Sequence, residues 1–272
     1  MGRSILIASG KGGVGKSTLA ASLSQALARQ GHKVCLLDMD IGLRGQDTFL
    51  GVESQIVYDS LDVLTGLCRL HDALIPIPGE DNLSLLPCPQ FSRAKDITPA
   101  QFRSLVDQVR ALFAYVIIDA PAGIERGLRG ILKASVDDCL LLCTPDDLCL
   151  RDAERVASLL QEKGLPRPRL IVNRLNDALI ESGEMYNAKT CSETLDLPLL
   201  GEIPDDINVD RAQLKHLWLY DIDCPARYAI ERIARRITGE AVPLPCIGKR
   251  RPWYIRMWDF LLEPRVKEVK HI

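Results

Sequence analysis

The 272-residue sequence has little of what several common protein classes require. Aromatic residues make up only 5%, which argues against a protein that stacks single-stranded nucleic acid on its side chains. The four histidines are isolated, and no CxxC pair occurs among the nine cysteines, so neither a zinc site nor a dithiol redox pair is indicated. No run of 18 apolar residues exists, so no membrane-spanning helix is expected.

The cysteine pattern and the N-terminus favour a cytoplasmic protein. The cysteines are odd in number, and several lie in apolar runs, as expected of buried free thiols in a reduced compartment. The apolar stretch 5–8 is too short for the core of a signal peptide. We therefore expect a reduced, cytoplasmic chain without a secretory leader.

Charge is distributed unevenly along the chain. The formal net charge is only −2, so no overall basic field attracts nucleic acid. From Lys249 onward, however, seven Lys and Arg residues stand against three Asp and Glu, a net of +4 that leaves −6 for the rest of the chain. An acidic body with a basic tail suggests that the tail meets an anionic partner.

Short apolar runs alternate with helical patterns along most of the chain. Such runs are typical of strands buried on both faces of a parallel sheet. The pattern predicts an α/β fold, namely a doubly wound, mostly parallel sheet flanked by helices, over a single domain at 1–240. The expected strands are 3–8, 33–38, 83–87, 115–119, 138–144, 169–173 and 199–203, and the expected helices are 17–30, 99–113, 125–135, 149–163 and 181–195.

A phosphate-binding loop follows the first expected strand. Residues 10–17 match the pattern GxxxxGK[ST] and lie between a strand and a helix, as the mechanism requires. Glycines let successive backbone N–H groups turn toward phosphate oxygens, and the helix that follows directs its positive end to the same place. The predicted nucleotide-binding residues begin with Gly10, Lys11, Gly12, Gly13, Val14, Gly15, Lys16, Ser17 and Thr18.

Oxygen-bearing side chains near this loop predict a Mg²⁺ site. The Ser17 hydroxyl suits Mg²⁺, and Lys16 can bridge the terminal phosphates. Asp119 ends the strand 115–119, where a carboxylate faces the ligand crevice of a parallel sheet. Asp38 and Asp40 end the second strand near the same edge. ATP and Mg²⁺ are accordingly the expected cofactors.

The second lysine of the loop is unusual and points to a family. KGGVGKST is the deviant Walker A motif, and the chain resembles the ParA/MinD family of dimerising P-loop ATPases, most specifically its division-site branch. The segments that carry the resemblance spread over most of 1–240: 9–18 (SGKGGVGKST), 36–47 (LLDMDIGLRGQD), 57–66 (VYDSLDVLTG), 116–125 (VIIDAPAGIE), 150–156 (LRDAERV) and 171–174 (IVNR).

The resemblance implies roles for individual residues. Lys11 would reach across a dimer interface to the nucleotide of the partner, with the logic of an arginine finger. Asp40 would be associated with the attacking water, so Lys11, Lys16 and Asp40 are the expected catalytic residues. Ser17, Asp38 and Asp119 would surround Mg²⁺, and Asn173 would read the adenine, for which an amide is suited because it both donates and accepts.

The C-terminal residues predict an amphipathic helix. After a basic, proline-containing linker at 241–252 comes WYIRMWDFLLE at 253–263, followed by a polar tail at 264–272. At about 100° per residue, Arg256, Asp259 and Glu263 fall on one side. Tryptophan and tyrosine suit a membrane interface, and basic residues suit anionic lipid, although docking on the domain or on a dimer partner stays open. The expected membrane residues are Trp253, Tyr254, Met257, Trp258, Phe260 and Leu261.

We therefore expect an ATPase that forms a homodimer with ATP, binds the inner face of the cell membrane peripherally and places the division site. The expected partners are a MinC-like division inhibitor, a MinE-like protein that stimulates hydrolysis, and anionic inner-membrane lipid, but no specific nucleic acid. Alternatives are a partition or flagellar-placement ATPase of the same family and a nucleotide-gated scaffold with little turnover. An iron–sulfur carrier is disfavoured because 119–124 (DAPAGI) contains no cysteine.

Overall fold

The computed structural model describes residues 1–40, 45–89, 98–121, 136–215 and 217–245. Within these residues, one eight-stranded sheet has the order β3-β4-β2-β5-β1-β6-β7-β8, with only β3 antiparallel to its neighbour. This confirms the predicted doubly wound, mostly parallel sheet. The strands are β1 (Arg3–Ala8), β2 (Val34–Asp38), β3 (Ile75–Pro76), β4 (Leu83–Leu86), β5 (Tyr115–Asp119), β6 (Asp138–Cys143), β7 (Arg169–Leu175) and β8 (Leu199–Pro204).

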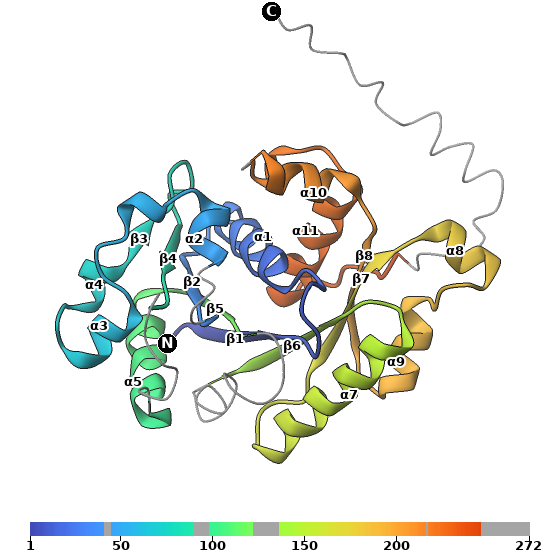
Figure 1. The fold of residues 1–272 in the computed structure, drawn as a ribbon, viewed down its shortest axis with the longest axis horizontal. Coiled ribbons are helices and arrows are strands. Elements are labelled where there is room, and N and C mark those ends of the chain that lie inside the picture. The colour runs from blue at the N-terminus through green and yellow to red at the C-terminus, as the bar shows by residue number, and fades with distance from the viewer. Residues whose placement is uncertain (41–44, 90–97, 122–135, 216, 246–272) are drawn as a thin grey trace, which may run out of the picture.

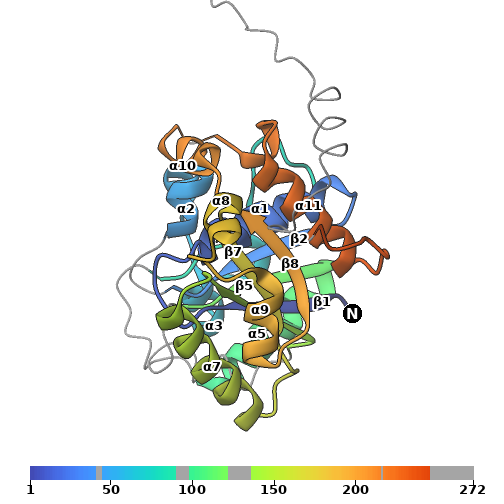
Figure 2. The ribbon, with the colours of Figure 1, turned by 90° about the vertical axis from the view of Figure 1, so that its right-hand side faces the viewer.

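Helices cover both faces of the sheet. α1, α10 and α11 lie over one face, and α5, α7 and α9 lie over the other, as both views show (Figures 1 and 2). The helices are α1 (Lys16–Arg29), α2 (Gly45–Leu50), α3 (Ser60–Thr65), α4 (Leu70–Ala73), α5 (Pro99–Leu112), α7 (Asp147–Glu162), α8 (Asp177–Ser182), α9 (Ala188–Leu195), α10 (Ile207–Leu214) and α11 (Pro225–Ile237). Short 3₁₀ turns lie at Glu53–Gln55 and Leu219–Asp221.

The central strands are apolar because helices cover both of their faces. Ile5, Leu6 and Ile7 of β1 and Val116, Ile117 and Ile118 of β5 are completely buried. Burying one such side chain contributes about 1.5–3 kcal/mol. The central strands therefore form the buried core of the sheet, and this core positions the loops at their carboxyl ends.

Local signals fix where several helices begin. Thr98 and Gln101 form a capping box at the start of α5, where Pro99 occupies the first turn. The Asp146 side chain accepts from the Cys149 N–H at 2.9 Å and so caps α7.

The expected helix at 181–195 is wrong in one respect, because the structure divides this part of the chain between two helices. α8 ends before Gly183, which has a left-handed φ of 82°. Asn187 then accepts from the Thr190 N–H at 2.9 Å and starts α9. A left-handed glycine followed by an Asn cap outweighed the continuous helical pattern.

Other sequence expectations fall partly outside the described residues. The expected helix at 125–135 and the amphipathic segment 253–263 lie there. All eight cysteines in the described part are free thiols. No helix in the described part is long and apolar enough to cross a bilayer.

Candidate nucleotide site

The phosphate loop joins β1 directly to α1. Gly13 and Gly15 have left-handed φ values of 78° and 94°, which side chains with a Cβ rarely adopt. No side chain caps the start of α1, and its first turn contains no acidic residue. The first N–H groups of α1 therefore have no capping side chain and are available to an anion.

Two close approaches hold the loop in place. A Cβ on Gly10 would lie 2.4 Å from the carbonyl carbon of Asp152 in α7. A Cβ on Gly15 would lie 2.7 Å from Nδ2 of Asn173 in β7, and that same nitrogen donates to the Val14 carbonyl at 2.8 Å. The loop is thus fixed between α7 and β7, and these contacts leave no room for a side chain at position 10 or 15.

Three predicted side chains meet beside the loop. The Lys16 ammonium forms a buried ion pair with Oδ1 of Asp119, and it lies 3.4 Å from the Ser17 hydroxyl. Asp38 and Asp119 are register partners on β2 and β5, so their carboxylates end at the same edge of the sheet. The sequence placed all of these residues at one site, and the structure brings them together there.

Burial and the negative charge of Asp119 disfavour the ionised forms of Asp38, at the end of β2, and Asp40, two residues beyond it. Burial raises the pKa of Asp38 to about 7, and the nearby Asp119 adds to this rise, although the Asp40 N–H donates to Asp38 at 2.9 Å. Burial also raises the pKa of Asp40, while Lys16 opposes that rise. A cation at this edge would therefore favour the ionised carboxylates.

The donor set fits Mg²⁺. A hydroxyl and carboxylates are the hard oxygen ligands that this ion prefers. In the described part of the chain, no group of three or more His, Cys, Asp or Glu residues could hold a metal unaided. Mg²⁺ usually binds one or two carboxylates together with substrate phosphates and water. Ser17, Asp38 and Asp119 are the residues that would hold it.

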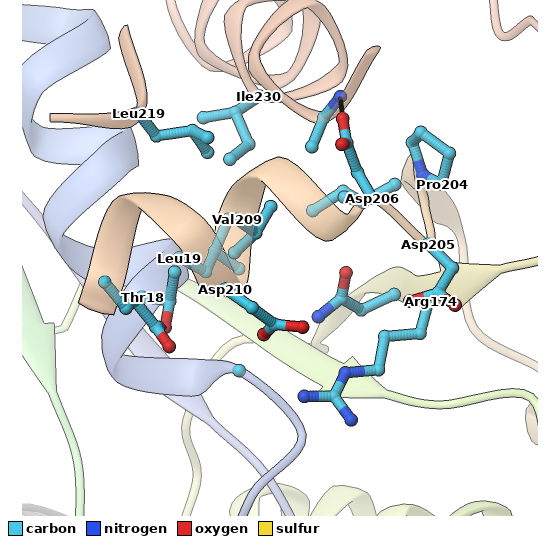
Figure 3. A pocket seen from close by; sticks show the side chains of 15 residues that line it. Thr18, Leu19, Arg174, Pro204, Asp205, Asp206, Val209, Asp210, Leu219 and Ile230 are labelled. Carbon is cyan, nitrogen blue, oxygen red and sulfur yellow. Dashed lines mark hydrogen bonds between the residues drawn. The ribbon is translucent and has the colours of Figure 1, made fainter. Parts of the chain in front are cut away.

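A pocket lies beside Gly15 and the first turn of α1 (Figure 3). Thr18 of α1 and Asp210 of α10 line one side, and Arg174 and Asp205 line the other, with Asn173 also in the wall. Nε2 of Gln213 donates to the Thr18 hydroxyl at 2.5 Å, which ties α10 to the start of α1. Gly15 and Asn173 also line this pocket, and the contact of Asn173 with adenine stays a prediction.

Sequence reasoning missed several residues of this pocket. Arg174 has a left-handed φ of 59°, an unusual conformation for a residue with a Cβ. Asp205 directly follows β8, and the carboxyl ends of parallel strands share one edge, so its position could have been noted. Asp210 and Gln213 lie on a helix that sequence reasoning did not predict, and no motif marks them.

Lys11 lies apart from Lys16. It is exposed and lines a separate open hollow with Asp146, Arg174 and Met185. Although burial acts to raise the pKa of Asp146, its hydrogen bonds with Thr144 and Cys149 and the charge of Lys11 lower it. The structure therefore does not place Lys11 with Lys16, Asp38 and Asp119. The buried Lys16 ammonium pairs with Asp119, whereas the exposed Lys11 lines this hollow.

Comparison with known proteins identifies the family. Residues 5–219 match the CobQ/CobB/MinD/ParA nucleotide binding domain. The chain belongs to this family. The family description makes the domain a nucleotide-binding one, in agreement with the phosphate loop.

Several relatives of this chain are septum site-determining proteins. The chain is 42% identical over 254 residues to the septum site-determining protein MinD of Bacillus subtilis, which covers 92% of the chain and 94% of that protein. It also matches a chain of the MinC:MinD cell division protein complex of Aquifex aeolicus, with a TM-score of 0.82 and 34% identity. The match covers 91% of the present chain and 100% of the Aquifex chain. The match to the septum site-determining protein MinD of Pyrococcus horikoshii complexed with Mg-ADP has a TM-score of 0.76 and 27% identity. It covers 88% of the present chain and 97% of the Pyrococcus chain.

Proposed function

We propose that the protein is a Mg²⁺-dependent ATPase that dimerises with ATP and controls the position of the division septum at the inner membrane. The observation that carries this proposal is the meeting of Lys16, Ser17, Asp38 and Asp119 at one edge of the sheet, directly beside a glycine loop. The 42% identity to a septum site-determining relative supports the biological role.

The chain's own residues divide the work of phosphoryl transfer. Backbone N–H groups of 10–17 and the Lys16 ammonium bind the phosphates, which requires Lys16 to leave Asp119. Ser17, Asp38 and Asp119 would hold Mg²⁺, which would supply positive charge to stabilise the transferred phosphoryl group. Asp40 orients the attacking water, and it lies next to Asp38 through the 2.9 Å hydrogen bond.

Lys11 completes the site from a second copy of the chain. It is exposed and lines an open hollow, whereas Lys16 is buried in its ion pair with Asp119. A positive charge supplied by a partner promotes phosphoryl transfer only in the dimer. ATP binding would then control both dimerisation and turnover.

The relatives and the sequence support the proposed partner proteins and the proposed binding to the membrane. The structure of a MinC:MinD complex supports a MinC-like division inhibitor as partner. A MinE-like protein that stimulates hydrolysis is the second partner that we propose, from the resemblance of the sequence. The basic segment 241–252 and the apolar side of 253–263 would bind anionic lipid, so 1–240, linker and tail form three functional parts. The protein would be cytoplasmic and would bind the membrane peripherally.

Two measurements test this function. ATP turnover should require Mg²⁺ and rise more than in proportion to protein concentration, because only the dimer is complete. Anionic liposomes should sediment the full chain with ATP but not with ADP, and a chain lacking 249–272 with neither. Turnover independent of Mg²⁺ would contradict the ATPase, and equal sedimentation in both nucleotide states would contradict the switch.

A further inference from the structure

Gln46, in the first turn of α2, reaches into the phosphate site. Its side chain is only 1% exposed. Nε2 donates to Oδ2 of Asp119 at 2.6 Å and to the backbone carbonyl of Ser17 at 3.0 Å. Its backbone N–H also hydrogen-bonds Asp38. One residue therefore contacts all three of the residues that would hold Mg²⁺.

The other atom of the same amide has no partner. Oε1 of Gln46 is buried, and among the described residues it has no hydrogen-bond partner. The orientation of the amide is fixed, because Asp119 Oδ2 and the Ser17 carbonyl are both acceptors and must face the nitrogen. The oxygen is bonded to the same carbon as this nitrogen, so it lies at the same end of the side chain.

An unpartnered buried acceptor at this position points to a ligand. Buried polar atoms nearly always have a partner, and an exception calls for a specific explanation. A hydrated Mg²⁺ keeps several water molecules, and each carries O–H donors. The fixed amide would offer such a water an acceptor on the side chain whose nitrogen already bonds Asp119 and the Ser17 carbonyl.

Gln46 is also placed to support Asp119 once a nucleotide binds. Asp119 has Lys16 at Oδ1 and Gln46 at Oδ2. When Lys16 turns to the phosphates, the Gln46 amide remains as a donor to this carboxylate. A carboxylate that keeps one hydrogen bond keeps its orientation, which is what outer partners of a metal site provide.

We propose that Gln46 is a positioning residue of the Mg²⁺ site. Its nitrogen orients Asp119, and its oxygen accepts from a water that arrives with the hydrated ion. This inference rests on the proposed function, because it assumes that Mg²⁺ and a nucleotide bind together here. It adds a residue that neither the glycine-loop pattern nor the strand-end carboxylates indicated.

The test measures how much Mg²⁺ strengthens nucleotide binding. A fluorescent N-methylanthraniloyl ADP is titrated with the full chain, once with Mg²⁺ and once with EDTA. In Gln46→Met, which keeps length but removes both polar atoms, the gain from Mg²⁺ should fall about 10- to 100-fold, as when other outer partners of metal sites are lost. Affinity in EDTA should stay at the wild-type value.

Gln25 in α1 provides a matched control. It is buried, its Nε2 donates to Glu80 at 2.7 Å, and its Oε1 also lacks a partner among the described residues. Gln25→Met removes the same groups away from the site and should leave both affinities unchanged. If Gln46→Met does not fold, Gln46→Asn keeps an amide that is too short to span both contacts, and the same loss is expected.

The outcomes separate the two proposals. An unchanged Mg²⁺ gain in Gln46→Met, or an equal loss with Mg²⁺ and with EDTA, would overturn the role of Gln46 while leaving the ATPase standing. An equal loss in Gln25→Met would overturn it as well. If the wild-type chain gains nothing from Mg²⁺, the proposed function itself fails.

Discussion

Asp38 and Asp119 are paired in register across β2 and β5, so two buried carboxylates end side by side at the edge of the sheet. Lys16 supplies only one positive charge to this pair, through Asp119. Burial raises the pKa of Asp38 to about 7, and the charge of Asp119 makes a smaller contribution to this rise.

The raised pKa makes the stability of the nucleotide-free protein depend on pH. Between the unfolded pKa of 3.8 and the folded value of about 7, the folded state binds the extra proton. The Asp38 contribution to the free energy of unfolding therefore falls as pH rises through this window, by about 1.4 kcal/mol per pH unit. The free energy of unfolding of the wild type and of Asp38→Asn should be measured by urea denaturation from pH 4 to 8. The difference between the two should show this slope, and the same pH dependence in both proteins would contradict it.

Lys16→Ala should abolish nucleotide binding. The ammonium is the charged donor for the terminal phosphates, and the substitution also leaves Asp119 without its ion pair. Breaking a buried pair costs about 3–5 kcal/mol of stability. Lys16→Ala/Asp119→Asn should recover most of that stability without recovering ADP binding in calorimetry. ATP affinity within a few-fold of the wild type in either variant would reject the loop assignment.

Lys11→Ala should bind ATP as a monomer but should neither dimerise nor hydrolyse it. The lysine is exposed, away from the Lys16–Asp119 pair, so its contact is expected in the partner. Analytical ultracentrifugation with a non-hydrolysable ATP analogue reads the dimer directly. Lys163→Ala, at an exposed lysine just after α7, is the control that should behave as wild type. A normal dimer with normal turnover in Lys11→Ala would reject the cross-dimer role.

Asp40→Ala should dimerise with ATP and remain dimeric. The loss removes the group that orients water while the loop, Lys16 and Ser17 stay intact. Turnover should drop by about 10²–10⁴-fold, the usual contribution of such a group. Persistence of the dimer after ATP addition, followed by light scattering, is the measurement. Turnover at the wild-type rate would remove Asp40 from the catalytic residues.

Trp258→Glu should detach the protein from anionic liposomes without changing ATP affinity. The substitution places a charge among the apolar residues of 253–263, while Asp259→Asn on the expected polar side should leave attachment unchanged. Two tails in an ATP dimer should raise avidity by roughly 10²–10⁴-fold over one. If the wild type ignores liposomes in both nucleotide states and Trp258→Glu unfolds, the segment is a docked structural helix.

The sequence could predict the sheet and the phosphate edge because their signals are local. Apolar runs such as 115–119 mark strands buried on both faces, and GxxxxGK[ST] names a backbone conformation as well as a chemistry. Strand-end carboxylates then follow from topology, since parallel strands deliver Asp38 and Asp119 to one edge.

What escaped prediction depends on contacts between distant segments. Gln46 is an ordinary polar residue in sequence, and only folding brings its amide to Asp119. Gln213 reaches Thr18 from a helix whose weak pattern gave no signal. Gly183 is one residue within a helical pattern, and its left-handed conformation decides where α8 ends.

The contact between Gly10 and Asp152 makes the phosphate loop and α7 one mechanical body. Because not even a methyl group fits between them, the loop cannot shift toward the helix, and the helix cannot shift inward without displacing the loop. A displacement of α7, such as one caused by a partner that binds its outer surface, would therefore also displace the phosphate loop, because the two are in direct backbone contact.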